Sequence, residues 1–141
     1  MKFVHEYGPG EAFPPLETTV TAEFNQQILF AQEDFDARTA DPQGGPAPVH
    51  PALLLALSAN TRSPGYRLAP GTGAVLAEDE VEFLAPAWVP ARLVVAWRVR
   101  EVYAKRGRTY QAIEGEVRDE AGVTILTRVM HVVLTRRQET P

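Results

Sequence analysis

The stretch that decides the fold is residues 44–57, GGPAPVHPALLLAL, in which a proline-rich loop ends at His50 and an apolar helix begins at Pro51. Proline suits the first helical position because its φ is already helical and its missing N–H would have no partner there. His50 is therefore predicted to be the N-cap. Because a helix N-terminus carries unpaired N–H groups and partial positive charge, this point of the chain can hold a negative charge.

The helix predicted over residues 51–62 is apolar on nearly every side, as the run of leucines after Ala52 shows. A helix that is hydrophobic all round is normally buried all round. Asn60 and the sequence SPG at 63–65 are expected to end it. We therefore expect this helix to form the centre of the core.

The rest of the chain predicts one more helix and five strands. Thr21 is an N-cap candidate for an amphipathic helix over 22–34, whose apolar residues Phe24, Ile28, Ala31 and Phe35 recur at helical spacing. The strand candidates are 16–21, 75–84, 93–102, 110–118 and 123–135, with hairpin turns at 105–108 and 119–122.

Two details of this pattern carry structural information. The alternation of polar and apolar residues slips at Arg100 and Glu101, which predicts a β-bulge. In 75–84 the apolar residues Val75, Ala77, Val81 and Phe83 are predicted to share one face. The final strand is apolar on both faces, so both faces need a cover, and a second subunit would supply it.

These elements predict one α+β domain over 1–141, a curved antiparallel sheet wrapped around a central buried helix. Residues 1–12 are expected to form a loosely ordered arm and 138–141 a C-terminal tail. A chain of 141 residues is long enough for one substantial core. Its hydrophobic content of 45% is that of a globular protein.

Composition also excludes several classes of function. The net charge of −4 argues against nucleic acid as a partner. The chain has no cysteine and three scattered histidines, so no transition-metal site is expected. No segment has the apolar run of a signal peptide or a membrane span, so a cytoplasmic protein without a membrane partner is expected.

Three local pieces, in a matching layout over about 13–136, resemble the MaoC-like (R-specific enoyl-CoA hydratase) group of the hotdog superfamily. Residues 45–50, GPAPVH, resemble the Gly-x-Pro-Ile-x-His-Gly motif before the hotdog helix, and 81–87, VEFLAPA, resemble its Val-x-Phe-x-x-Pro-Val strand end. The hairpins near Gly107 and at 119–122 lie where the family has them. The resemblance implies a hotdog fold, a homodimer or higher homo-oligomer, and an acyl-CoA or acyl-carrier thioester as partner. It implies no cofactor other than coenzyme A as part of the substrate.

The catalytic signature of that family is Asp-x-Asn-Pro-x-His, directly after the first helix. The matching window here is 36–41, DARTAD, in which Asp36 keeps the aspartate and Asp41 replaces the histidine. The resemblance thus gives Asp36, Asp41 and His50 as candidate catalytic residues, although the normal Asp/His pair is absent. A carboxylate can act as a base if burial or a neighbour raises its pKa. Alternatively, the two aspartates form Asx turns, with Arg38 as an ion-pair partner that lowers both pKa values, and His50 is only a helix cap.

The family polarises the thioester carbonyl with the N–H of the glycine after the motif histidine, and Pro51 replaces that glycine. Ala52 and Leu53 are the next candidate donors. One oxyanion donor typically stabilises the transition state by about 3–4 kcal/mol. Loss of the glycine N–H is therefore expected to lower the family's usual activity. Arg106 and Arg108 are candidate contacts for the phosphates of coenzyme A, the alternative being a solvated hairpin tip.

Three functions remain open at this level. The first is a hydratase or dehydratase acting on an acyl thioester. The second is a thioesterase on the same fold. The third is a non-catalytic acyl-CoA-binding protein or a subunit that pairs with an active partner.

Overall fold

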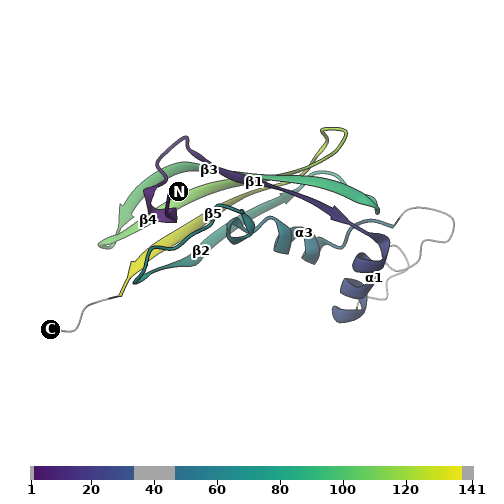
Figure 1. The fold of residues 1–141 in the computed structure, drawn as a ribbon, viewed down its shortest axis with the longest axis horizontal. Helices are drawn as coiled ribbons and strands as arrows, with labels where there is room; N and C mark the ends of the chain where they lie inside the picture. The colour runs from purple at the N-terminus through teal and green to yellow at the C-terminus, as the bar shows by residue number, and fades with distance from the viewer. Residues whose placement is uncertain (1, 34–46, 138–141) are drawn as a thin grey trace.

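The computed structural model describes residues 2–33 and 47–137, which form one five-stranded antiparallel sheet with short helices (Figure 1). The strand order across the sheet is β1-β3-β4-β5-β2, so β1 and β2 are its edges. In chain order the elements are η1 (Val4–Glu6), β1 (Ala12–Val20), α1 (Ala22–Ala31), α3 (Pro51–Leu57), η2 (Asn60–Arg62), β2 (Thr72–Phe83), β3 (Ala91–Lys105), β4 (Arg108–Asp119) and β5 (Thr124–Arg136).

The sheet arches over α3, which lies along its concave face (Figure 1). Leu53, Leu54 and Leu57 of the helix are buried there. They belong to one core cluster with side chains from the three central strands, among them Leu93, Val95, Trp97, Ile113, Val117, Leu126 and Met130. This arrangement confirms the predicted α+β class, a curved antiparallel sheet wrapped around a central helix.

The central helix is shorter and more exposed than the sequence predicted. It ends at Leu57, and η2 follows as a separate turn. Leu55 is half-buried and Ala56 is exposed, so the prediction of burial on every side is wrong. The reason is that the sheet covers one side of α3 only.

The strand register shifts at four places, and two of these shifts bear on the predictions. The one in β3 lies between Val99 and Glu101, as predicted. A second one, between Leu76 and Glu78 of β2, was not predicted and reverses the alternation along that strand. The expectation that Val75 and Val81 share one face is therefore wrong, because they pair with Val133 and Arg128, which lie on opposite faces of β5. Strand β2 is exposed along most of its length.

The N-terminal segment is packed rather than loosely ordered, which corrects the prediction for residues 1–12. Val4 is 1% exposed, and the ring of Tyr7 stacks on Phe13 with the ring centroids 4.3 Å apart. The side-chain amide of Gln111 donates to the carbonyl oxygens of Val4 at 2.9 Å and Tyr7 at 3.1 Å. The predicted tail at 138–141 lies outside the described residues.

Helix α1 begins where predicted, with the side chain of Thr21 accepting the N–H of Phe24 at 3.1 Å. Its buried residues are Asn25 and Leu29, whereas Phe24 is 44% exposed. Of the predicted apolar face, Ile28 packs against the core, whereas Phe24 and Ala31 are exposed. Asn25 faces inward because it makes the contacts described next.

Candidate functional site

Residues 47–49, the segment before α3, are hydrogen-bonded to residues 87–89, in the connection between β2 and β3. The N–H of Val49 donates to the carbonyl of Ala87 at 2.7 Å, and the N–H of Val89 donates to the carbonyl of Ala47 at 2.9 Å. Pro48 and Trp88 form a bridge between them. The start of the helix is therefore held by main-chain bonds on one side.

The side chain of Asn25, on α1, forms two hydrogen bonds with the same segment. Its side-chain oxygen accepts the N–H of His50 at 2.9 Å, and its amide donates to the carbonyl of Pro48 at 2.9 Å. The Asn25 side chain is fully buried, so its end of both bonds is shielded from water, while Pro48 and His50 are half-buried. This residue was not predicted as part of the site, because a polar residue inside an amphipathic helix gives no signal of its distant partner.

His50 is the N-cap of α3, as the sequence predicted. Its Nδ1 accepts the N–H of Ala52 at 3.0 Å. A ring nitrogen that accepts carries no proton, so the imidazole in this arrangement has its proton on Nε2. The other predicted role of His50, in catalysis, stays a prediction.

The first amides of α3 already have acceptors. Pro51 has no N–H, the N–H of Ala52 donates to the His50 ring, and the N–H of Leu53 donates to the carbonyl of His50 at 3.0 Å. The N–H of Leu54 donates to the same carbonyl at 3.3 Å. Ala52 can therefore bind a substrate oxygen only after the His50 ring has turned away.

The two candidate carboxylates, Asp36 and Asp41, lie outside the described residues, as does Arg38. Their part in the site stays a prediction from the resemblance. In sequence they lie between the end of α1 and Ala47, the two segments that Asn25 joins.

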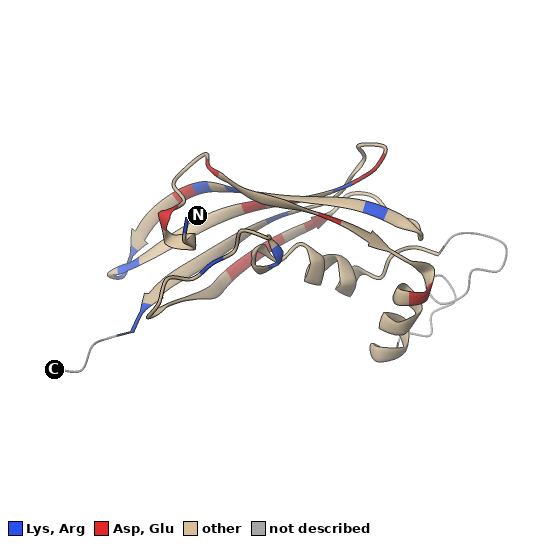
Figure 2. Ribbon diagram, viewed as in Figure 1, with Lys and Arg blue, Asp and Glu red and all other residues tan. Residues whose placement is uncertain are grey.

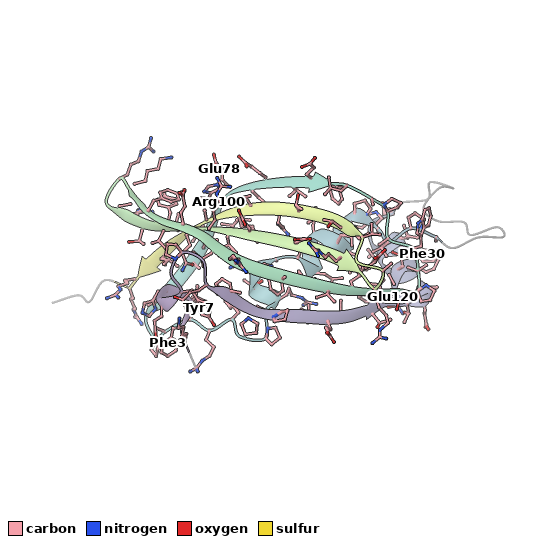
Figure 3. All side chains as sticks on the ribbon, turned by 90° about the horizontal axis from the view of Figure 1, so that it is seen from above. Phe3, Tyr7, Phe30, Glu78, Arg100 and Glu120 are labelled. Atoms are coloured by element: carbon pink, nitrogen blue, oxygen red, sulfur yellow. The ribbon has the colours of Figure 1, made fainter. Side chains whose placement is uncertain are left out.

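The structure does not bring Arg106 and Arg108 to His50. They form the hairpin between β3 and β4, where Lys105 pairs with Arg108, while the helix start lies beside the residues before Ala91. The 15 residues of β3 separate the two ends, which is roughly 45 Å at about 3.3 Å per residue. Figure 3 shows the length of the fold along which these ends lie, with Phe3 and Tyr7 toward one end and Phe30 at the other.

A group of titratable side chains on the sheet face opposite α3 was also not predicted. The hydroxyl of Tyr103 lies 2.9 Å from Nδ1 of His131, and its ring stacks on Tyr110. Partial burial, followed by the charges of Glu78, Tyr110 and Glu101, raises the pKa of Tyr103 above its ordinary value of 10.0. The group could have been inferred only from strand register, since Tyr103 and Tyr110 face each other across the hairpin.

No cluster of three or more metal-ligating side chains occurs among residues 2–33 and 47–137. Within those same residues, no helix is both long and apolar enough to cross a membrane.

Comparison with known proteins finds the fold but no relative in sequence. No family model matches, and no curated protein matches. The structure is similar to the MaoC-like dehydratase from Rhodospirillum rubrum, with TM-score 0.78, 18% identity and coverage of 99% of this chain and 100% of that chain. It is similar to the R-hydratase PhaJ1 from Pseudomonas aeruginosa, with TM-score 0.74, 17% identity and coverage of 97% and 92%. It is also similar to a thioesterase superfamily member from Thermus thermophilus, with TM-score 0.60, 19% identity and coverage of 92% and 84%.

These similarities establish that the chain has the hotdog fold, which MaoC-like dehydratases and R-hydratases share. The fold predicted from the residues around His50 is thereby confirmed. Function has to be argued from the site, because one fold supports several chemistries.

Proposed function

We propose that the protein is a MaoC-like protein that binds an acyl-CoA or acyl-carrier thioester beside the start of α3 and adds or removes water there. The observation that carries this proposal is the similarity to a MaoC-like dehydratase over essentially the whole of both chains. The position of His50 supports it, because two hydrogen bonds to the buried Asn25 side chain fix the segment that the family uses to enter its central helix.

In the hydration direction, water adds its hydroxyl group to the β-carbon of an enoyl thioester and a proton is delivered to the α-carbon. The water needs a base and the thioester carbonyl needs a hydrogen-bond donor. We assign the base to Asp36, with Asp41 as the second carboxylate, and a proton-transfer or orienting role to His50. Arg106 and Arg108 are proposed contacts for the phosphates of coenzyme A.

The proposed site needs a second copy of the chain, since Arg108 and His50 of one copy are separated by the length of β3. An exposed edge supports a homodimer. Apolar side chains remain exposed on β2 and just after it, and isolated proteins seldom leave such surface uncovered: Val75, Leu76, Val81, Phe83, Leu84 and Trp88.

The test is turnover of a panel of enoyl-CoA thioesters, followed by the loss of absorbance of the conjugated thioester. We expect turnover by the native protein and a loss of at least tenfold in kcat/KM for Asp36→Ala. Glu120→Ala, which removes an exposed carboxylate from the β4–β5 hairpin, is the matched control and should change kcat/KM by less than twofold. Absence of turnover with every member of the panel would contradict the proposal.

The second candidate function is a non-catalytic acyl-CoA-binding protein or partner subunit. The specific observation in its favour is that Pro51 supplies no N–H and that the amides of Ala52 and Leu53 are already bonded. It predicts saturable binding of acyl-CoA by calorimetry without chemical change. Purification of a homodimer alone, without acyl-CoA binding, would argue against it.

A thioesterase is the third candidate, and the similarity to the Thermus thermophilus protein supports it. Hydrolysis of the thioester releases a free thiol, whereas hydration of the double bond releases none. A thiol-specific reagent therefore separates the two reactions in the same assay. Thiol release that depends on Asp36 would replace the hydratase proposal with this one.

A further inference from the structure

Trp88, in the connection between β2 and β3, keeps much of its indole ring exposed. It is 51% exposed, whereas Trp97, the other tryptophan of the chain, is 1% exposed and belongs to the core. Tryptophan is highly buried on average, and indole rings that stay exposed are enriched in binding surfaces. The surroundings of Trp88 therefore bear on what this protein binds.

Main-chain pairing fixes Trp88 beside Pro48. The two hydrogen bonds of their bridge flank this pair rather than join it. In an antiparallel bridge, such a pair has its Cα atoms about 4.5 Å apart and its side chains on the same face. The side chains of Pro48 and Trp88 lie on the outward face, because the four residues that flank them are buried: Ala47, Val49, Ala87 and Val89.

The side chain of His50 starts from the same outward side. The backbone of His50 is extended, with φ −61° and ψ 134°, and alternate side chains of an extended segment point to one side. Asn25 bonds the carbonyl of Pro48 and the N–H of His50 together, which places these two groups on one edge of the segment. His50 therefore follows Pro48 by about 6.6 Å along the segment, and Trp88 lies directly across from Pro48.

Trp88 belongs to an uncharged outward row along the connection between β2 and β3. Burial alternates over residues 84–91, and the exposed members of the row are Leu84, Pro86, Trp88 and Pro90. The indole N–H is the single hydrogen-bonding group among these four side chains. Neither 84–91 nor 47–60 contains a lysine, arginine, aspartate or glutamate, and Figure 2 shows α3 without a charged residue.

Such a row suits the apolar part of a thioester. The phosphates of coenzyme A need charged donors, and the amide groups of its pantetheine arm need hydrogen-bond partners, which this row does not supply. An acyl chain needs neither. Complete burial of one methylene group strengthens binding about fourfold, so contact with a wall on one side gives about twofold per methylene.

A second copy of the chain is the competing occupant of this row. The exposed apolar side chains of β2 extend to Phe83, directly before Leu84. However, residues 47–50 are bonded to 87–89 along one edge and to Asn25 along the other, so a strand of another chain cannot pair with them. What remains accessible beside His50 is the outward side-chain face, which is where the thioester is proposed to bind.

We infer that Trp88 is a contact for the acyl chain of the thioester, and that its row gives the site a preference for long apolar acyl groups over short ones. This inference rests on the proposed thioester site at the start of α3, but not on the addition of water there. Trp88 acts on binding and specificity, and it has no part in the transfer of protons.

The test is the tryptophan fluorescence of the native protein during titration with octanoyl-CoA, butyryl-CoA and free coenzyme A. These saturated acyl groups have no double bond to hydrate, so the measurement reports binding. Octanoyl-CoA should shift the emission to shorter wavelength, protect it from quenching by acrylamide, and bind about tenfold more tightly than butyryl-CoA. Free coenzyme A should give no shift. The signal comes from Trp88, because Trp97 is buried with its Nε1 donating to the carbonyl of Ser58 at 2.8 Å.

Variants test the same contact by calorimetry. Trp88→Ala should weaken octanoyl-CoA binding at least fivefold, whereas Trp88→Phe keeps an apolar ring and should stay within about twofold of the native protein. In Trp88→Phe the remaining emission, from Trp97, should not respond to octanoyl-CoA. Leu68→Ala removes another exposed apolar side chain, in the loop before β2, and is the control that should leave binding unchanged.

Three results would overturn the inference. One is the absence of octanoyl-CoA binding, and another is binding that leaves the Trp88 emission unchanged. The third is dissociation of a homodimer in Trp88→Ala at the same protein concentration, which would make Trp88 a subunit contact. Enoyl-CoA turnover that depends on Asp36 but not on Trp88 would leave the proposed function standing without this contact. Binding that shifts the Trp88 emission without any turnover would keep the contact and remove the proposed reaction.

Discussion

The side-chain oxygen of Asn25 accepts the backbone N–H of His50 at 2.9 Å, across 25 residues of sequence. The same side chain donates to the carbonyl of Pro48 at 2.9 Å, so one amide group satisfies a donor and an acceptor on the segment before α3. Asn25 is fully buried, and a buried polar side chain normally has hydrogen-bond partners such as these. The position of His50 therefore depends on helix α1 as much as on its own helix.

Replacing Asn25 should destabilise the protein. In Asn25→Leu the carbonyl of Pro48 and the N–H of His50 lose their bonds in a partly buried place, and each such loss costs about 1–3 kcal/mol where the group is fully buried. We expect the free energy of unfolding in urea to fall by about 2–4 kcal/mol in total. Gln27→Ala, an exposed position two residues later on the same helix, is the control and should change it by less than about 0.5 kcal/mol. Equal effects of the two substitutions would show that the Asn25 bonds are not important.

The sequence predicted those parts of the fold that depend on neighbouring residues. Pro51 after His50 predicted the helix start and its cap, and the slip at Arg100 predicted the bulge of β3. It did not predict the bulge of β2, because the apolar residues of that strand happen to fall at positions that a regular strand would also use. Nothing in the local pattern signals a bulge there.

The features that the sequence did not predict depend on contacts between residues that are distant in the sequence. The arm at 1–12 is packed because Gln111 binds two of its carbonyl groups, over separations of 107 and 104 residues. The inward position of Asn25 and the facing pair of Tyr103 and His131 depend equally on tertiary placement. Composition and periodicity carry no information on such pairs.

The cap made by His50 can be separated from any catalytic role of that residue. His50→Ala removes the acceptor for the N–H of Ala52 and should lower the free energy of unfolding by about 1 kcal/mol, whereas His50→Ser restores a cap and should lower it less. If His50 also takes part in the proposed reaction, both variants lose kcat to the same extent despite their different stabilities. Full activity of the stable His50→Ser variant would limit the residue to capping.

The raised pKa of Tyr103 predicts a loss of stability in alkaline solution. A tyrosine whose pKa is higher in the folded protein keeps its proton after the unfolded chain has lost it. Its contribution is therefore complete below the unfolded value of 10.0 and is lost as the pH rises from there through the folded pKa. Burial also raises the pKa of Tyr66, so the loss has two sources.

Difference titration of tyrosinate absorbance between the native protein and Tyr103→Phe gives the pKa of Tyr103 directly. Glu78→Gln removes one of the charges that raise this pKa and should lower it. Glu17→Gln, an exposed carboxylate on β1 at the other edge of the sheet, is the control and should leave it unchanged. A Tyr103 pKa at or below 10.0 in the native protein would contradict the described environment.

The buried side chain of Arg128, on β5, forms hydrogen bonds with the end of α3. Its guanidinium group donates to the carbonyl of Leu55 and to the hydroxyl of Ser58, both at 2.8 Å, and pairs with Asp79 of the edge strand β2. The Arg128 side chain is 5% exposed and that of Asp79 is 25% exposed. Removing one member of such a pair leaves the other charge partly desolvated, which typically costs about 3–5 kcal/mol for a fully buried pair.

Arg128→Met should therefore lower the free energy of unfolding by about 2–4 kcal/mol, less than a fully buried pair would lose because water reaches Asp79. Arg118→Met breaks the exposed pair with Glu116 and serves as the control, with an expected loss of less than about 1 kcal/mol. The double variant Arg128→Met, Asp79→Leu should recover part of the loss, because it removes the unpaired carboxylate as well. Additive losses in that double variant would show that the two charges do not stabilise each other. The hydrogen bonds to Leu55 and Ser58 would then be the main contribution of Arg128.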